Sequence, residues 1–376
     1  MRVEFYLLDA MEVLHFAPVA RELIQMGVDM VFISTRGDAH SAAPGWYNSE
    51  TAEELLERSG LPFAATPNFD ADIAVTTNTT HILRGYRGLR ARMSYGVALV
   101  WYYENTPRER YFSGFDLCLL HGEFDASIAR DYISAARVSV VGYPRYDAWF
   151  RNRPNRRLTR SKYDLFGTKP SILYLPTWEH RSSIDRFADS IFVLAEDFEV
   201  LVKPHHCTYR MEKERMQKLR TGPVTVLDPY MPPEDAFALA DMVISDLDSG
   251  ALTDAILLNK KVVALGDSRQ VARLLLPEVK KVLPICVTPT DVVDRFHKIF
   301  AQTEISSGMV KIRGHMFDTT EGRDAQRAAR AIVECVERNR GRRWSRVRTG
   351  LRWRKEKLRR HVGRVARRYG LLKQNR

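Results

Sequence analysis

Side chains that bind phosphate or transfer protons gather at three points in the second half of this 376-residue chain. The three groups are Pro176-Thr177-Trp178, Lys203-Pro204-His205-His206 and Ser245-Asp246-Leu247-Asp248-Ser249. Hydroxyl and backbone N–H groups bind phosphate, and a carboxylate binds ribose. An imidazole can transfer a proton beside a phosphorus atom while a bond to that phosphorus breaks. The Ser249-Gly250 step, at a predicted helix start, adds free N–H groups and the positive end of a helix dipole. This chemistry predicts a site for a nucleotide with a pyrophosphate.

Each group follows a short apolar run that is rich in β-branched residues, which predicts a buried parallel strand. The expected strands of the second half are Ser171–Tyr174, Val200–Lys203, Val224–Leu227, Met242–Ser245 and Val262–Leu265. Helical patterns lie between them, at Asp189–Ala195, Thr208–Leu219 and Pro233–Ala240. Ligands of open parallel sheets bind beyond the carboxyl ends of the strands, so we expect the three groups to meet at one rim.

The first half shows the same alternation of strand and helix. Its expected strands are Val3–Leu8, Met30–Ile33, Asp72–Val75, Ala98–Trp101, Asp116–Leu120 and Val138–Val141. A helix containing Val19, Leu23 and Ile24 follows the first of them. The polar stretch Arg151–Arg160 separates the two halves. The sequence therefore predicts an α/β protein with two Rossmann-like domains, residues 1–150 and 151–337, that face each other across a cleft.

The positive charge of the chain is confined to its last segment. The whole chain carries +12, whereas residues 338–376 hold seventeen Lys or Arg and one acidic residue and carry +16, so residues 1–337 carry −4. Apolar residues recur in this segment at helical spacing, at Trp344, Val347, Leu351, Leu358, Val362, Val365, Tyr369 and Leu372. The pattern predicts a basic amphipathic helix on an anionic membrane surface, with a solvated tail as the alternative. Nucleic acid is not an expected partner, because the segment lacks interleaved aromatics for base stacking.

Other features favour a protein on the cytoplasmic face of the membrane. The longest nearly unbroken apolar run, Tyr95–Tyr103, is far shorter than the roughly 18 residues that span a bilayer. Asp9 ends the first apolar run, so no secretory signal is expected. The four cysteines share no CxxC spacing, which predicts reduced thiols rather than disulfides or a zinc site. We expect no structural metal and no other cofactor, and a catalytic divalent ion would bind mainly through phosphates of the substrate.

Four separated motifs, in their order and spacing, resemble one family. YLPTW followed by Ser182-Ser183, then VKPHH, then ADMVISDLDSGALTDA, are similar to the C-terminal half of CDP-glycerol glycerophosphotransferases of the teichoic-acid primase and polymerase type. The pattern of that family runs PTW, K-x-H-P and ADxxISDxSS, followed by an acidic residue. GYPRYD, at Gly142–Asp147, resembles the interdomain segment of the family. The resemblance covers about residues 90–275.

This resemblance implies a GT-B fold and a transferase whose C-terminal domain binds a CDP-alcohol such as CDP-glycerol or CDP-ribitol. The phospho-alcohol would pass to a hydroxyl of a lipid-linked or growing glycan of the cell envelope, a teichoic acid or capsular polysaccharide, with release of CMP. Carried over to this chain, His205 is the histidine near the donor phosphates. The residues that would bind the donor are Thr177, Lys203, Ser245, Asp246, Ser249 and Asp254.

The chain departs from the family pattern at several positions. Asp248 replaces the first serine of the Ser-Ser pair, and His206 replaces the proline of His-Pro. Tyr95-Gly96 replaces an N-terminal His-Gly, and the lysine near that pair is missing. If the missing histidine is the base for the acceptor hydroxyl, another group must take its place. His15 and His121, which follow predicted strands of the first half, are the candidates.

Structural and functional alternatives remain open at this point. Ser245 and Asp246 would also serve as caps for the following helix, and Arg145 as a contact between the domains. One alternative function is a GT-B glycosyltransferase or 2-epimerase-like enzyme that uses a nucleotide sugar. The other is a non-catalytic, nucleotide-binding subunit of polysaccharide synthesis.

Overall fold

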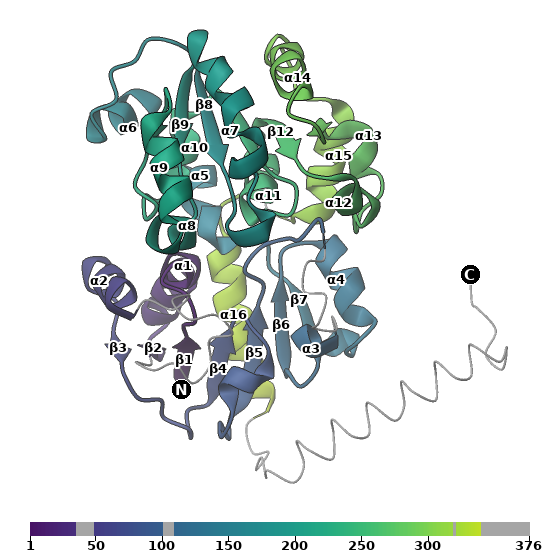
Figure 1. Cartoon of the computed structure of the whole chain (residues 1–376). Coiled ribbons are helices and arrows are strands. Elements are labelled where there is room, and N and C mark those ends of the chain that lie inside the picture. The colour runs from purple at the N-terminus through teal and green to yellow at the C-terminus, as the bar shows by residue number, and fades with distance from the viewer. Residues whose placement is uncertain (35–48, 101–108, 319–320, 340–376) are drawn as a thin grey trace, which may run out of the picture.

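Two parallel sheets, one from each half of the chain, lie one above the other with helices packed around them (Figure 1). The computed structural model describes residues 1–34, 49–100, 109–318 and 321–339. The basic segment predicted to bind a membrane lies, from residue 340 onward, outside these residues. Within the described ranges, no helix combines the length and the apolar character that crossing a membrane requires.

The first sheet has seven strands in the order β3-β2-β1-β4-β5-β6-β7, and all its neighbouring strands are parallel. The strands are β1 Arg2–Tyr6, β2 Asp29–Ile33, β3 Phe63–Ala64, β4 Ile73–Thr76, β5 Leu89–Met93, β6 Leu117–Leu120 and β7 Val138–Val140. Helices cover both faces, so the central strands carry buried apolar side chains on both sides, such as Phe5 on one face and Ala74 on the other. The direction of strand order reverses between β1 and β4, where open sheets leave a crevice.

The second sheet repeats this arrangement with six strands in the order β10-β9-β8-β11-β12-β13, again all parallel. The strands are β8 Ser171–Leu175, β9 Glu199–Val202, β10 Thr225–Val226, β11 Met242–Asp246, β12 Lys261–Leu265 and β13 Ile285–Cys286. Its switch in strand order lies between β8 and β11. Two of the three predicted groups of polar residues, those after β8 and β11, therefore follow the two strands that flank this crevice.

Helices connect the strands in the crossover pattern that parallel strands require. In the first half and at the interdomain junction they are α1 Glu12–Gln25, α2 Ser49–Ser59, α3 Glu109–Phe112, α4 Glu123–Arg130 and α5 Asp147–Arg151. The second half contains α6 Arg156–Lys162, α7 Ile184–Val193, α8 His206–Met211, α9 Lys213–Thr221, α10 Pro233–Leu239, α11 Gly250–Leu257, α12 Ser268–Ala272, α13 Val279–Val282, α14 Asp291–Phe300, α15 Ser307–Met316 and α16 Asp324–Arg338. The helix predicted at Thr208–Leu219 is two helices, α8 and α9, separated at Glu212.

The strand predicted at Ala98–Trp101 is wrong for the residues that the structure describes. Residues 98–100 form a loop, and Val100 makes an isolated antiparallel bridge to Leu274. Leu99 and Val100 are buried in the apolar core of the second domain, so this apolar run fills the contact between the domains instead of a sheet. The strand found in its place is β5, in which every second residue is an arginine at positions 90 and 92. The sequence of β5 is therefore not an apolar run.

The last described helix, α16, returns the chain to the first domain. It belongs to the range 151–337 that the sequence assigns to the second domain, yet Ala328, Ile332 and Val336 pack in the core of the first sheet. The GYPRYD segment holds the start of this helix, because Asp147 accepts hydrogen bonds from the N–H groups of Asp324 (3.0 Å) and Ala325 (2.8 Å). The chain therefore crosses between the domains twice.

Glycine is required within that segment. Gly142 has a φ of 80°, and a Cβ at this position would lie 2.3 Å from the carboxyl group of Asp324. That carboxylate accepts a hydrogen bond from the N–H of Tyr143 at 2.8 Å. The motif thus joins the first sheet to α16 and fixes the position of the segment that leads into the second domain.

Candidate functional site

A pocket of about 350 Å³ lies between the two domains, at the carboxyl ends of the central strands of both sheets. The second-domain wall is formed by segments after β8, β9, β10 and β11, within residues 175–181, 203–206, 229–237 and 248–254. The first-domain wall is formed mainly by segments within residues 8–12, 77–78, 92–98 and 111–128. Both crevices at the switches in strand order therefore open onto one shared space.

The loop after β8 is held in place by residues that do not line the pocket. Asp246 Oδ2 accepts hydrogen bonds from the N–H and the hydroxyl of Thr177, both at 2.6 Å. Ser245 Oγ donates to the carbonyl of Leu175 at 2.8 Å. Ser245 and Asp246 are almost fully buried and do not line the pocket, whereas Thr177 does. Of the residues predicted to bind the donor, these two therefore position the Thr177 loop from behind.

Lys203 and His205 follow β9 and both line the pocket. Lys203 Nζ donates to the carbonyl of Pro229 at 2.7 Å. Burial, with repulsion from Arg145, lowers the pKa of Lys203 to about 8, so the ammonium form still predominates at neutral pH. An anion bound beside this group would favour the charged form and raise the pKa again.

His205 has a defined ring orientation and a defined tautomer. Its Nδ1 accepts a hydrogen bond from the N–H of Cys207 at 3.1 Å, which makes His205 the N-cap of α8, and its ring stacks on Trp178. Burial, followed by the neighbouring ring of His206, lowers the pKa of His205 well below its usual value. Because Nδ1 is an acceptor in this neutral ring, the proton lies on Nε2. His205 therefore offers a hydrogen-bond donor suited to a phosphate oxygen.

The next residue, His206, connects the two walls of the pocket. Its Nε2 lies 3.0 Å from Asp9 Oδ2, in the loop after β1, and both side chains are more than nine-tenths buried. The N–H direction is not aligned with the carboxylate, so the contact is electrostatic and not a hydrogen bond. Asp9 itself is oriented by α1, because its Oδ1 accepts from the N–H of Met11 at 2.8 Å. The sequence identified His206 only as a departure from a motif and did not identify Asp9.

The turn after β11 brings a helix N-terminus to the pocket. Ser249 caps α11 by accepting from the N–H of Ala251 at 3.2 Å, and residues 248–251 line the pocket. The free N–H groups and the dipole of this eight-residue helix favour an anion there. Asp248 lies beside the same turn with its Oδ1 unpaired and buried, and burial raises the pKa of its carboxyl group. Asp248 therefore opposes an anion at the place where the helix favours one.

Arg145 and Asp254 form a buried polar pair that lines the pocket. The guanidinium lies 3.9 Å from Asp254 Oδ2, which also accepts a hydrogen bond from Tyr146 Oη at 2.7 Å. Asp254 therefore joins the interdomain segment to α11 through Oδ2, while its Oδ1 is buried without a hydrogen-bond partner. The Arg145 Nε atom is buried without a hydrogen-bond partner, so this cation keeps capacity for another anion.

Glu12 organises the first-domain wall. One of its carboxylate oxygens accepts hydrogen bonds from the N–H groups of Leu8 (2.5 Å) and Asp9 (3.2 Å), and the other accepts from the hydroxyl of Thr77. Burial raises the pKa of Glu12 to about 7 despite these bonds. Glu12 lies at the start of α1, directly after β1, so the strand-end rule applied to the first half would have identified it.

Two further charged groups of this wall were not predicted. Arg92, on β5, donates to Ser94 Oγ at 3.0 Å and lies over the rings of Tyr111 and Phe112. Asp125, on α4, has a buried Oδ2 without a partner, and burial raises its pKa to about 7 although Arg92 lowers it. A cation, an acid and two aromatic rings give this side of the pocket the groups that bind polar, ring-containing ligands.

His15 and His121, the two histidines predicted as bases, lie outside the pocket. Both are buried behind the first-domain wall, in a cluster of rings with Tyr95 and Tyr143, and neither lines the cavity. Burial lowers the pKa of both, that of His121 to about 4. The structure therefore brings His205 to the pocket but leaves His15 and His121 in the core of the first domain.

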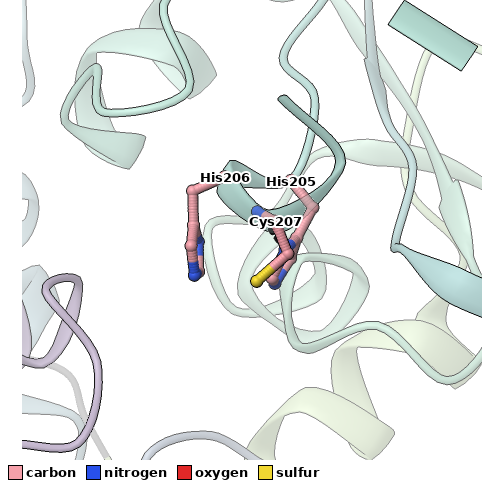
Figure 2. Close-up of side chains that lie close together, drawn as sticks. All are labelled: His205, His206 and Cys207. Atoms are coloured by element: carbon pink, nitrogen blue, oxygen red, sulfur yellow. Dashed lines mark hydrogen bonds between the residues drawn. The ribbon is translucent and has the colours of Figure 1, made fainter. Parts of the chain in front are cut away.

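His205, His206 and Cys207 offer ligand atoms within 4.8 Å of one another (Figure 2). The set nevertheless makes a poor metal centre. The Nδ1 atom of His205 is occupied by the N–H of Cys207, and burial raises the pKa of the Cys207 thiol to about 12, whereas metal binding requires a thiolate. We do not assign a metal site to these residues.

Comparisons with known proteins identify the family and the fold. Residues 116–334, more than half of the chain, match the family described as CDP-Glycerol:Poly(glycerophosphate) glycerophosphotransferase. No curated protein matches the chain by sequence. The fold is similar to that of the wall teichoic acid polymerase TagF soaked with CDPG, with a TM-score of 0.60 and 15% identity over 91% of this chain and 90% of that one.

Two other solved structures share the same architecture. A UDP-GlcNAc 2-epimerase from Neisseria meningitidis bound to UDP-GlcNAc has a TM-score of 0.57 and 14% identity over 90% of this chain and all of that one. MnaA from S. aureus, in complex with UDP, has a TM-score of 0.59 and 15% identity over 89% of this chain and 96% of that one. At these identities the likeness establishes the fold alone, and it confirms the prediction of two facing Rossmann-like domains in the GT-B arrangement.

Proposed function

The chain belongs to the CDP-glycerol:poly(glycerophosphate) glycerophosphotransferase family, and from this premise we propose that it transfers a phospho-alcohol from a CDP-activated donor to a glycan of the cell envelope. The donor is CDP-glycerol or CDP-ribitol, the acceptor is a hydroxyl of a lipid-linked or growing chain, and CMP is released. The observation that carries this proposal is the composition of the second-domain wall. It holds cationic and N–H groups from several strand ends around one space.

These groups suit the diphosphate of the donor. Lys203 and Arg145 supply positive charge, His205 supplies the Nε2–H donor, and the N-terminus of α11 supplies free N–H groups. In phosphoryl transfer, charge builds up on the phosphate oxygens and on the leaving oxygen, so fixed donors of this kind lower the barrier. The proposal therefore places the donor on the second-domain wall.

The first-domain wall is left for the acceptor. Arg92 with its two aromatic neighbours and Asp125 present both stacking and polar groups to the pocket, as a glycan with hydroxyl and phosphate groups requires. The proposal invokes no metal held by the protein, and a divalent ion would be bound through the donor phosphates.

A panel of donors tests this function. CDP-glycerol, CDP-ribitol, CDP, UDP-GlcNAc and a GDP-sugar are each added to the full-length protein, and the melting temperature is measured. At a ligand concentration 100 times the Kd, one-site binding contributes about 2.7 kcal/mol to stability, which is readily detected. CMP release is then followed with the stabilising donors and a short glycerol phosphate oligomer as acceptor.

The proposal expects both a melting shift and CMP release with at least one CDP-alcohol. Stabilisation and turnover with UDP-GlcNAc, without either effect from any CDP-alcohol, would overturn it in favour of a nucleotide-sugar enzyme. The absence of any shift with all the donors would also contradict it.

The basic segment supports a second part of the proposal, peripheral attachment to the inner face of the membrane. The segment carries the excess positive charge of the chain, whereas residues 1–337 carry −4. Each Lys or Arg near an anionic bilayer contributes on the order of 1 kcal/mol, so part of the segment is sufficient for binding. Attachment would also bring the pocket close to an acceptor carried on a lipid.

Deletion of residues 340–376 tests the attachment. The cut follows α16, which ends at Arg338, so the packed part of the chain is kept. We expect the full-length protein to sediment with vesicles that contain anionic lipid and the truncated protein to stay in the supernatant, with equal melting temperatures for both. Neutral vesicles are the control. Equal sedimentation of both proteins would disprove the attachment and leave the donor site unaffected.

A further inference from the structure

The proposed reaction needs a group that takes the proton of the acceptor hydroxyl. Histidine titrates near neutral pH and is the side chain most often used for this purpose. Among the described residues, the only histidines that line the pocket are His205 and His206. His205 cannot take this proton, because its Nδ1 accepts from the N–H of Cys207 and its Nε2 carries the proton.

In His206, unlike in His205, Nε2 has a polar neighbour and Nδ1 is free. Nε2 faces Asp9 Oδ2 at 3.0 Å, and no described residue forms a hydrogen bond with Nδ1. Nδ1 is also not among the fully buried polar atoms, although the whole side chain is only 7% exposed. His206 lines the pocket, and Nδ1 is the ring nitrogen that the contact with Asp9 leaves free. A carboxylate close to one ring nitrogen and a free second nitrogen resembles the arrangement of catalytic Asp-His bases, except that here the carboxylate contact is electrostatic.

Asp9 is held in place for this task from the other domain. Its Oδ1 accepts from the N–H of Met11, and its own N–H donates to Glu12 at 3.2 Å. The carboxylate is therefore fixed on the rigid start of α1, while the imidazole is fixed at the start of α8. The pair forms only when the two domains face each other, and this places it where donor and acceptor would meet.

We infer that His206, oriented by Asp9, is the general base that removes the proton from the acceptor hydroxyl. The inference rests on the proposed function and adds a catalytic residue to it. The acceptor oxygen forms a bond to the phosphorus next to the alcohol, and the bond from that phosphorus to the bridging oxygen breaks. The bridging oxygen leaves with its electron pair as part of CMP. The hydroxyl proton moves to His206 Nδ1, and the resulting imidazolium is stabilised by Asp9.

The carboxylates of the pocket are less suited to this role. Both oxygens of Glu12 already accept hydrogen bonds, from Leu8, Asp9 and Thr77. Asp125 lies on α4 in the first-domain wall, with Arg92 of the same wall as its charge partner. Asp248 and Asp254 line the second-domain wall, where the donor is proposed to bind. Asp125 is the competitor on the first-domain wall, and its substitution belongs in the test.

The groups that face the His206 ring come from three segments. They are Asp9 from the loop after β1, Tyr230 from the loop after β10, and His205 and Cys207 from the start of α8. His205 stays neutral and Cys207 stays a thiol, because burial shifts their pKa values in those directions. Asp9 is therefore the charged group that faces the His206 ring.

The test compares His206→Gln with His297→Gln in the full-length protein. His297 also lies near a carboxylate, Asp197, at 3.8 Å, but this pair is exposed and distant from the pocket lining, so it is a matched control. We expect His206→Gln to lower kcat about 10²- to 10⁴-fold, the usual contribution of a general base. Donor-induced melting shifts should be unchanged, and His297→Gln should behave as the wild type. Asp9→Asn should lower kcat by a smaller factor.

The pH dependence of kcat separates a base from a contact that merely holds the domains together. The wild-type rate should fall at acid pH, because a protonated imidazole cannot accept a proton, and His206→Gln should lose this acid limb. A rate that drops equally at every pH, with the acid limb retained, would overturn the inference.

Two other results would also overturn the inference. One is a kcat for His206→Gln within about threefold of the wild type, a change far below the effect of a base. The other is loss of the acid limb in Asp125→Asn and not in His206→Gln. If the wild type neither binds nor turns over any CDP-alcohol, the proposed function itself fails, and the inference fails with it. That outcome is distinct from an active wild type with an active His206→Gln variant.

Discussion

The two walls of the pocket are built in different ways. The second-domain wall takes its groups from short contiguous motifs. Local contacts fix two of them, since His205 caps α8 and Ser249 caps α11, and a contact between strand ends, from Asp246 to Thr177, fixes the third. The first-domain wall takes Glu12 and Arg92 from segments far apart in the sequence. Polar groups at a strand end can therefore be fixed by their neighbours in the chain, whereas the first-domain wall depends on the assembled domain.

Among the groups proposed to bind the donor, His205 has the largest expected effect. His205→Asn keeps an N-cap side chain for α8, because asparagine is a good N-cap, but it removes the Nε2–H donor. We expect kcat to fall about 10²- to 10³-fold, the cost of losing one donor to developing charge, with little change in melting temperature. Steady-state kinetics with the preferred CDP-alcohol checks this. Full activity in this variant would mean that His205 does not take part in the reaction.

A variant behind the same wall should affect stability. Asp246→Ala leaves the N–H and hydroxyl of Thr177 without their acceptor in a buried site. We expect a loss of about 3 kcal/mol in the free energy of unfolding, measured by urea denaturation, because unsatisfied buried donors are costly. Asp246 does not line the pocket, so residual folded protein should keep its donor affinity. A change smaller than about 1 kcal/mol would mean that the Thr177 loop does not depend on this carboxylate.

The first-domain wall can be probed by pH. The pKa of Glu12 rises from 4.5 to about 7 on folding, so between these values the folded protein holds a proton that the unfolded chain has lost. The wild type therefore loses stability as pH rises through this window, by about 3 kcal/mol from this group. Glu12→Gln should flatten the difference in melting temperature between pH 5 and pH 8.

A control for Glu12 is available on the surface of the same domain. Glu57, on α2, is exposed, and Glu57→Gln should leave the pH dependence of the wild type unchanged. An unaltered pH dependence in Glu12→Gln would show that the buried carboxyl group does not contribute. Such a result would mean that Glu12 does not make the stability of the first-domain wall depend on pH.

The smallest expected effect concerns Asp248, the acidic exception in the second-domain wall. Its carboxylate lies beside the N-terminus of α11, where the donor diphosphate is proposed to bind. Asp248→Asn should tighten CDP binding about fivefold, because removal of one nearby like charge is worth about 1 kcal/mol. Calorimetry at two salt concentrations measures this, since screening should reduce the gain. Weaker CDP binding in the variant would mean that Asp248 contacts the ligand favourably.

Much of the fold was predictable because apolar runs report buried parallel strands directly. The exceptions have clear causes. Strand β5 carries Arg90 and Arg92, so its pattern is not apolar, and the apolar run Leu99–Val100 is buried against the second domain. Helix α16 follows the second domain in sequence but packs on the first, which no local pattern reveals.

The candidate site was predictable where strand ends carry contiguous polar groups. Thr177, Lys203, His205, Ser249 and Asp254 all reach the pocket. A position at a strand end does not determine whether a side chain faces the pocket. Ser245 and Asp246 do not line the pocket, and their hydrogen bonds hold the loop after β8 in place. His15 and His121 are buried for the same reason, since each lies near a strand end but faces the core.

The sequence alone determined the α/β class, the strand-end motifs and the family resemblance, because these depend on residues that are neighbours along the chain. Only the tertiary structure decided which side chains share the pocket. The contact of His206 with Asp9 joins residues almost two hundred positions apart, and it exists only because two separately folded sheets present their carboxyl ends to each other.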